Sequence, residues 1–299
     1  MSASGQVQVA APKADAARVA SIRNSLDLKD QSAIGAFGER ARREVTAAGE
    51  RLVAEVRTRD IIDSVEILKH ALNLLAGLDP ATLIPRGGLA DLFNGRDARL
   101  DRFRAKFEQN AKIIDGLCGD LKERAERLDR KAGSLNQLHD HAKTFILELD
   151  AYLEAGRLRM GEARSVVDPA SASKHDLAML DGAERLGQRL KDLQAVRVAA
   201  VEQLPLVRIV QNVDGPLGDT LNAALEAIRR WKADWSERLG MHLGRHVRIR
   251  PDEIGLQNAK AELVSALEAA VSALSEARQR RTEAEEQMDR AAKATRRAA

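Results

Sequence analysis

Apolar residues recur at alternating steps of three and four through the central part of the chain, from Leu100 to Tyr152. Only Asn110, Arg124 and Lys131 interrupt this heptad pattern. Because these steps average 3.5 residues, the apolar side chains form one stripe on a helix, which other helices must cover with left-handed winding. At 1.5 Å per residue the helix would be about 80 Å long, more than the core of a compact globule spans. We therefore expect a rod built of long helices.

A second long stripe follows a turn signal at Asp168-Pro169. The same spacing then runs from Met179 to Val207, so this segment is expected to return antiparallel to the first as a helical hairpin. Pro205 lies within the return helix, where its ring removes one backbone hydrogen bond and crowds the preceding turn. The return helix is therefore expected to be kinked there.

The interruptions of these patterns divide the chain into four segments. Residues 1–30 are small and polar without sustained periodicity, which indicates a flexible N-terminal arm. Residues 31–95 carry helical patterns followed by a connector rich in Gly and Pro. Residues 96–240 form the predicted hairpin with its kinked return helix. Residues 241–299 combine a basic connector with a C-terminal heptad helix.

Composition supports the helical interpretation. Of 299 residues, 44% are hydrophobic, enough for a continuous core, and only 3% are aromatic. Abundant Ala, Leu, Glu, Lys and Arg are typical of long helices, whereas sheets prefer β-branched and aromatic residues. The predicted fold class is all-α: an elongated bundle of long antiparallel, coiled-coil-like helices with an N-terminal helical segment.

The charge and cysteine content say more about the cellular compartment of the protein than about any reaction it carries out. The 48 Lys and Arg nearly balance 45 Asp and Glu, and the formal charge of +3 does not by itself indicate nucleic acid. Cys118 is the only cysteine, so neither an intramolecular disulfide nor a CxxC site can form. The sequence shows no secretion signal and no long uncharged apolar run. We expect a cytoplasmic protein, with peripheral association at the inner membrane as an alternative.

The sequence holds no constellation that predicts catalysis. His139, Asp140 and His141 are the only local group of imidazoles and a carboxylate, but adjacent helical residues point about 100° apart and do not share a metal ion well. Cys118 has no neighbouring His or second Cys and is expected to be a small buried hydrophobe. We therefore expect no enzyme, no catalytic residues, no metal ligands and no cofactor.

Five residues are candidates for contact with a protein partner. Trp231 and Trp235 lie one helical turn apart, where core packing is the default, although tryptophan is also enriched at interface hot spots. Lys232 adjoins them. Arg208 and Gln211 interrupt an apolar helix, so they either set helix register through buried hydrogen bonds, which we favour, or face a partner.

A basic segment provides candidates for contact with an anion. Arg245, His246, Arg248 and Arg250 create a local positive field that can attract an oxyanion, phosphate head groups or nucleic acid. The segment lacks interleaved aromatic residues for base stacking. We therefore interpret it first as a basic connector.

A resemblance to a known family lies in residues 203–235, QLPLVRIVQNVDGPLGDTLNAALEAIRRWKADW. This segment resembles the TelA-like toxic anion resistance family of bacteria, in which a Gln-x-Pro-x-Ile-Arg-like helix precedes an Ile-x-x-Trp-Lys element. Upstream, FGERARREV, LDPATL, LDRFRAKFEQNAKIID and LELDAYLEAGR look like the corresponding stretches in the same order. The chain departs from the family at Arg229 and Arg230, where a proline usually precedes the tryptophan. It also has residues 212–216 in place of an Asn-rich segment.

The resemblance implies a soluble, all-helical bacterial protein linked to tolerance of tellurite and similar oxyanions, often with envelope stress, and with no settled enzymatic activity. Our first hypothesis is a non-enzymatic helical scaffold that binds protein partners in envelope or metalloid stress, without a small-molecule substrate. A second is a basic nucleic-acid adaptor, resting on the isoelectric point near 9.1 and the basic segment. A third is a membrane-surface binder, which the narrow apolar stripes suit less well.

Overall fold

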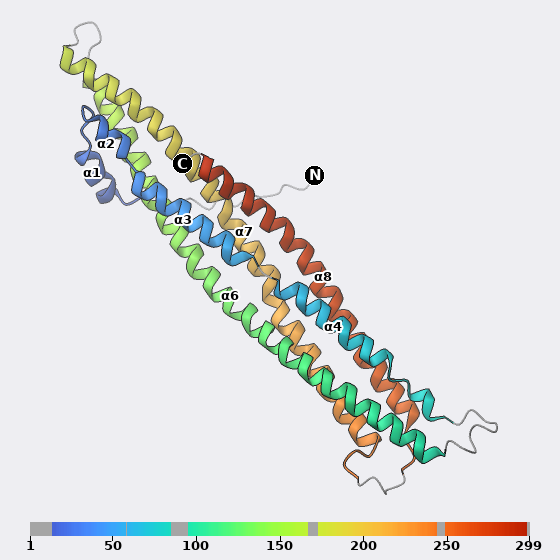
Figure 1. The fold of residues 1–299 in the computed structure, drawn as a ribbon. Coiled ribbons are helices and arrows are strands. Elements are labelled where there is room, and N and C mark those ends of the chain that lie inside the picture. Colours follow the sequence, from blue (N-terminus) through green and yellow to red (C-terminus); the bar gives the residue numbers. More distant parts are fainter. Residues whose placement is uncertain (1–13, 58, 85–94, 167–172, 244–248, 298–299) are drawn as a thin grey trace, which may run out of the picture. The chain divides into compact units, whose positions relative to one another are not determined.

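The protein is helical wherever its computed structural model describes regular structure, in residues 14–57, 59–84, 95–166, 173–243 and 249–297 (Figure 1). No strand occurs in these ranges. The elements are α1 (Ala16–Ser25), α2 (Gln31–Ala36), α3 (Glu39–Val56), α4 (Asp60–Ala76), the 3-10 helix η1 (Pro80–Leu83), α6 (Arg96–Val166), α7 (Lys174–Arg238) and α8 (Glu253–Arg297). The predicted all-α bundle of long helices is confirmed.

The chain divides into two compact units that do not coincide with the four predicted segments. Unit 1 consists of residues 1–57, 134–209 and 284–299, and unit 2 of residues 58–133 and 210–283. Helices α6, α7 and α8 each contribute residues to both units. Each unit thus joins stretches that are distant in the sequence, which local hydrophobic patterns do not reveal.

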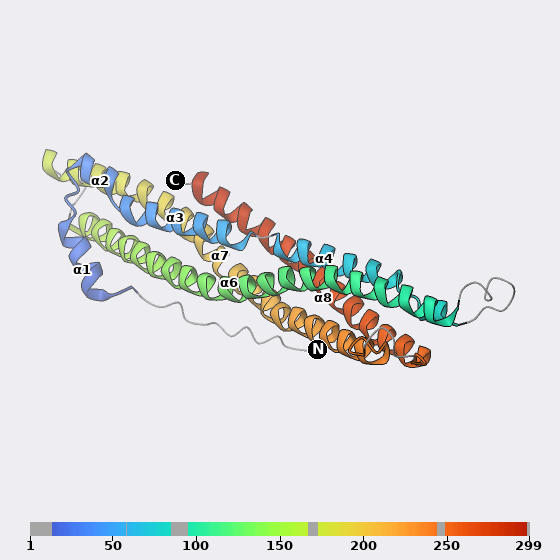
Figure 2. The ribbon, with the colours of Figure 1, turned by 60° about the horizontal axis from the view of Figure 1, so that its bottom comes forward.

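Unit 1 packs α1, α2 and α3 against antiparallel stretches of α6 and α7 (Figures 1 and 2). Its core is aliphatic apart from Phe37 and the partly buried Phe145 and Tyr152. The Phe37 ring meets Tyr152 edge to face, with centroids 5.2 Å apart. This contact joins the turn before α3 to α6.

The N-terminal part of unit 1 differs from the predicted flexible arm. Residues 1–13 lie outside the described residues, but α1 begins after Asp15, whose side chain accepts a hydrogen bond from Ala17 N at 3.0 Å. Val19 and Ile22 of α1 are buried, as is Leu28 in the following connection. Burial of these few apolar residues, spread over a polar stretch, orders a segment that looked too polar to fold.

Unit 2 packs α4 and η1 with the remaining stretches of α6, α7 and α8 (Figure 2). Asn110, which interrupts the heptad stripe, is 9% exposed, and its Nδ2 donates to the carbonyl of Leu74 at 2.9 Å. Arg124, a second interruption, lies 3.5 Å from the Asp63 carboxylate of α4. The polar breaks in the stripe therefore make contacts between helices rather than mark an end of α6.

Helix α7 continues through Pro205 and Pro216 without a break. Neither proline ends the helix, and the predicted kink at Pro205 stays a prediction. In the part of the chain that the structure describes, no helix is both long and apolar enough to cross a membrane.

Candidate functional site

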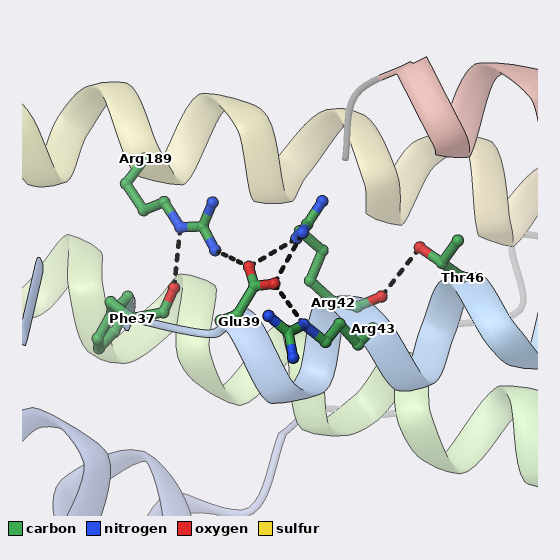
Figure 3. Close-up of polar contacts among 6 residues, drawn as sticks. All are labelled: Phe37, Glu39, Arg42, Arg43, Thr46 and Arg189. Carbon is green, nitrogen blue, oxygen red and sulfur yellow. Dashed lines mark hydrogen bonds and ion pairs between the residues drawn. The ribbon is translucent and has the colours of Figure 1, made fainter. Parts of the chain in front are cut away.

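The densest charged cluster of unit 1 surrounds Glu39 at the start of α3 (Figure 3). Gly38 precedes it with φ of 70°, a left-handed conformation that lets the chain enter the helix directly after a sharp turn. The Glu39 carboxylate accepts hydrogen bonds from Arg42 at 2.8 Å and Arg43 at 2.6 Å on the same helix. It also accepts one from Arg189 of α7 at 2.8 Å. One carboxylate thus holds three guanidinium groups from two helices.

Arg189 is oriented by a second acceptor. Its Nε donates to the backbone carbonyl of Phe37 at 3.0 Å, so it binds both the turn before α3 and the first residue of that helix. Hydrogen bonds from Arg42, and those from Arg43 and Arg189, hold the pKa of Glu39 far below its ordinary value. Because Glu39 remains ionised, the cluster fastens α3 to α7 at neutral pH. The segment FGERARREV resembles the family in sequence, but Arg189 is 150 residues from Glu39 and no local pattern links the two.

The two tryptophans that were candidates for partner contact lie in the core of unit 2. Trp231 is 3% exposed and Trp235 is 0% exposed. Their ring centroids are 5.1 Å apart, and both rings pack against Phe107, each with centroids 5.5 Å from it. Trp235 Nε1 also donates to the backbone carbonyl of Leu256 at 3.0 Å. Trp235 is fully buried, and Trp231 only borders a hollow of about 520 Å³ between α7 and α8, so the structure favours the core alternative for both residues.

The other three candidates bind neighbouring helices. Lys232 Nζ of α7 donates to Asp115 Oδ1 of α6 at 2.6 Å within unit 2. In unit 1, Arg208 donates to Asn136 Oδ1 at 2.6 Å. In unit 2, Gln211 Nε2 donates to the carbonyl of Ala132 at 3.3 Å. These contacts agree with the favoured role of Arg208 and Gln211 in helix register, although Arg208 is exposed rather than buried.

Of the four predicted anion-contact residues, only Arg250 lies within the described residues. Arg245, His246 and Arg248 lie outside the described residues. Arg250 is described and exposed, two residues before the N-cap region of α8. Contact of this segment with an anion stays a prediction.

The residues considered for chemistry have ordinary surroundings. Cys118 is half-buried rather than fully buried, and burial raises the pKa of its thiol, which disfavours the reactive thiolate. It lines a hollow of about 430 Å³ between α6 and α7, together with Asp115 and Lys232. His139 Nδ1 lies 3.2 Å from Asp140 Oδ1. Across the described ranges, no three His, Cys, Asp or Glu side chains are grouped so that they could hold a metal ion.

Two buried polar positions on α7 were not predicted from the sequence. Asp214 and Arg281 of α8 form an ion pair in unit 2 and are 4% and 2% exposed. Gln203 of unit 1 is 1% exposed and lies against Gly49 of α3. Neither its Oε1 nor its Nε2 has a hydrogen-bond partner among the described residues. Both Asp214 and Gln203 lie among the apolar positions of α7, and this placement is the sequence signal that could have indicated their burial.

Comparison with known proteins relates the chain to one family. A family model described as "Toxic anion resistance protein (TelA)" matches residues 19–235. YaaN, an uncharacterized protein of Bacillus subtilis, is 22% identical over 281 residues, which cover 87% of this chain and 73% of YaaN. YceH, an uncharacterized protein of the same organism, is 20% identical over 213 residues, covering 68% of this chain and 59% of YceH. A TelA-like protein of Staphylococcus saprophyticus is 23% identical over 236 residues, covering 74% of this chain and 63% of that protein.

The chain therefore spans between about three fifths and three quarters of the lengths of these relatives. No solved structure matches the chain. The matched range includes the Glu39 cluster, Gln203, Asp214 and both tryptophans.

Proposed function

Because the chain belongs to the TelA family of toxic anion resistance proteins, we propose that it acts as a non-enzymatic helical scaffold in envelope or metalloid stress. In this proposal it contributes to tolerance of an oxyanion such as tellurite by binding other proteins. It acts in the cytoplasm, with peripheral association at the inner membrane as the alternative location.

One observation carries the proposal: half-buried and buried charged side chains of the matched range bind charged partners on neighbouring helices. Glu39 binds Arg189 between α3 and α7, and Asp214 binds Arg281 between α7 and α8. Arg197 of α7 likewise binds Asp150 of α6. Groups engaged in this way fix the arrangement of helices, and they are not available to polarise a substrate or transfer a proton. A fixed helical frame supports a role in contact rather than in reaction.

The enzymatic alternative is tested with the purified full chain, tellurite and either NADPH or a thiol as reductant. We expect no loss of tellurite beyond that in a protein-free control. Steady turnover proportional to protein concentration would overturn the scaffold proposal. The variant Cys118→Ser serves as a matched control, since any turnover that depends on this thiol disappears in it.

The role in tolerance is tested in a strain from which the protein has been deleted. We expect wild-type protein and Cys118→Ser to restore growth on tellurite equally, because the proposal assigns the thiol no reaction. Loss of rescue by Cys118→Ser at normal protein level and helicity would contradict the proposal.

A further inference from the structure

Two hollows on the surface of unit 1 meet at Ala294 of α8. One has a volume of about 650 Å³ and is lined by residues of α7 from Gly187 to Glu202 and by Arg157 and Met160 of α6. The other, about 580 Å³, is lined only by residues of the last two turns of α8, which are Arg290, Lys293, Ala294 and Arg297. Ala294 lines both hollows, so they adjoin at this residue, and together they are called here the α7–α8 groove.

The floor of the α7–α8 groove is apolar and partly open. Val198 is 44% exposed, and it lies in the groove together with Leu190, Met160 and the small residues Ala195 and Ala199. Small side chains let a second helix approach closely, and an exposed valine gains free energy when it is covered. From Gly187 to Glu202 the groove extends over 15 helical steps, or about 22 Å. This length matches a helix of about four turns.

The rim of the groove is strongly basic. Arg290, Lys293 and Arg297 follow each other at steps of three and four, so they lie on one face of α8. None of the three has an ion pair or hydrogen bond to another described residue, whereas Arg197 and Arg189 in the same unit are engaged with carboxylates. Lys191 and Arg157 add two further cations. Five cations therefore line the groove against one acid, Glu202.

We propose that the α7–α8 groove binds an acidic amphipathic helix of a partner protein. The apolar face of this helix covers Val198 and its neighbours, and carboxylates on its flanks pair with Lys191, Lys293 and Arg297. The inference rests on the proposed scaffold function and deepens it by giving the partner a chemistry and a place. An apolar floor between basic walls complements such a helix better than nucleic acid, which offers phosphates but no apolar face.

The test uses the full chain and a fluorescein-labelled synthetic peptide of about 20 residues, with Leu at heptad a and d positions and Glu at the flanking positions. A second peptide carries Lys in place of every Glu. We expect the Glu peptide to raise the fluorescence anisotropy in a saturable way, and the Lys peptide to leave it unchanged. Affinity for the Glu peptide should decrease with added salt, because exposed charge pairs are screened.

Two variants locate the binding, each with a matched control in unit 1. Lys191→Glu/Lys293→Glu should bind the Glu peptide about tenfold or more weakly, whereas Lys143→Glu on the exposed surface of α6 should stay within about twofold. Val198→Gln should also weaken binding, whereas Leu177→Gln, which changes a 52% exposed residue outside the groove, should not. Circular dichroism establishes that all four variants keep their helicity.

Equal binding of both peptides, no binding of the Glu peptide, or binding that the groove variants do not weaken would overturn the inference. Groove-dependent binding of anionic phospholipid vesicles or of a DNA duplex in place of the Glu peptide would overturn it as well. Any of these results leaves the scaffold proposal standing. Tellurite turnover by the purified chain would overturn the scaffold proposal, whatever the result of the peptide-binding experiment.

Discussion

The Asp214 carboxylate of α7 accepts a hydrogen bond from the Arg281 guanidinium of α8, and the two side chains are 4% and 2% exposed. Asp214 Oδ1 has no partner among the described residues, so the carboxylate is only partly satisfied. Burial raises the pKa of Asp214 above its ordinary value, and the hydrogen bond from Arg281 opposes this shift. Removing one partner of a buried ion pair lowers the free energy of unfolding strongly, because the other charge stays buried without its partner. Replacing both partners lowers it little.

We therefore predict that Arg281→Met lowers the free energy of unfolding by about 3–5 kcal/mol at pH 7. The double variant Asp214→Asn/Arg281→Met should recover most of this loss. Urea unfolding followed by circular dichroism measures both. Additive losses in the double variant would contradict the buried-pair interpretation.

The same carboxyl predicts a pH dependence. Because the pKa of Asp214 is raised on folding, the folded chain retains a proton that the unfolded chain releases, and its contribution to stability decreases as pH rises above about 4. The deficit of Arg281→Met relative to the double variant should thus shrink as pH falls from 7 towards 4, because the lone carboxyl can take up a proton. A deficit that is constant over this range would show that Asp214 does not titrate there.

Glu39 should respond to pH in the opposite sense. Its pKa is lowered on folding, so its contribution is present above its ordinary value in the unfolded chain and is lost as pH falls below that value. Glu39→Gln is expected to lower stability by about 1–3 kcal/mol at pH 7 and by less at acidic pH. Unfolding in urea at several pH values measures the difference from wild type.

Glu44→Gln is the matched control for this prediction. Glu44 lies on the same helix and has no hydrogen bond or ion pair to another described residue. Its replacement should change the free energy of unfolding by less than about 0.5 kcal/mol. An equal effect of the two substitutions would mean that the three arginines do not stabilise α3.

The buried tryptophans give a comparison between two similar substitutions. Trp235 Nε1 donates to Leu256, whereas Trp231 Nε1 is buried without a partner among the described residues. Trp235→Phe should therefore cost about 1 kcal/mol more than Trp231→Phe, because only the first removes a hydrogen bond. Thermal unfolding monitored by far-ultraviolet circular dichroism compares them. A larger loss of stability from Trp231→Phe would contradict a stabilising role of the hydrogen bond between Trp235 and Leu256.

A glycine pair tests the packing of the N-terminal residues. A Cβ at Gly182 of α7 would overlap the backbone carbonyl of Leu28, whereas a Cβ at Gly161 of α6 would meet no atom within 4 Å. Gly182→Ala should destabilise the protein, since backbone must move. Gly161→Ala should stabilise it by about 0.5–1 kcal/mol through helix propensity. If Gly182→Ala were also stabilising, the segment between α1 and α2 would not pack on α7.

Local patterns predicted the long helices because a stripe such as that from Leu100 to Tyr152 depends only on residues within the same turn or the next. The same information cannot tell which residues meet from distant parts of the chain. Glu39 and Arg189 are 150 residues apart, and each alone is typical of a solvated helix surface. Likewise, Trp231 and Trp235 have the spacing expected of either a core or an interface. The packing of Phe107 from α6 against both rings shows that they belong to the core.

The N-terminal helix shows a different limit. In α1 only Val19 and Ile22 are buried, too few apolar positions to produce a pattern. They become ordered because α6 and α7 provide a surface that the segment itself cannot supply. The α7–α8 groove was not predicted for a related reason, since Ala294 and Val198 are ordinary residues until the fold brings their helices together.

The division of α6, α7 and α8 between the two units has a consequence for how this protein can be cut, fused or recombined. Unit 1 takes in both termini and a central stretch, while unit 2 takes in the two stretches between them. No single break in the chain separates the two units, because every fragment that contains all of unit 2 also carries part of unit 1, and any break divides unit 1. A single crossover therefore cannot exchange one unit for its counterpart from a relative and leave the other unit intact.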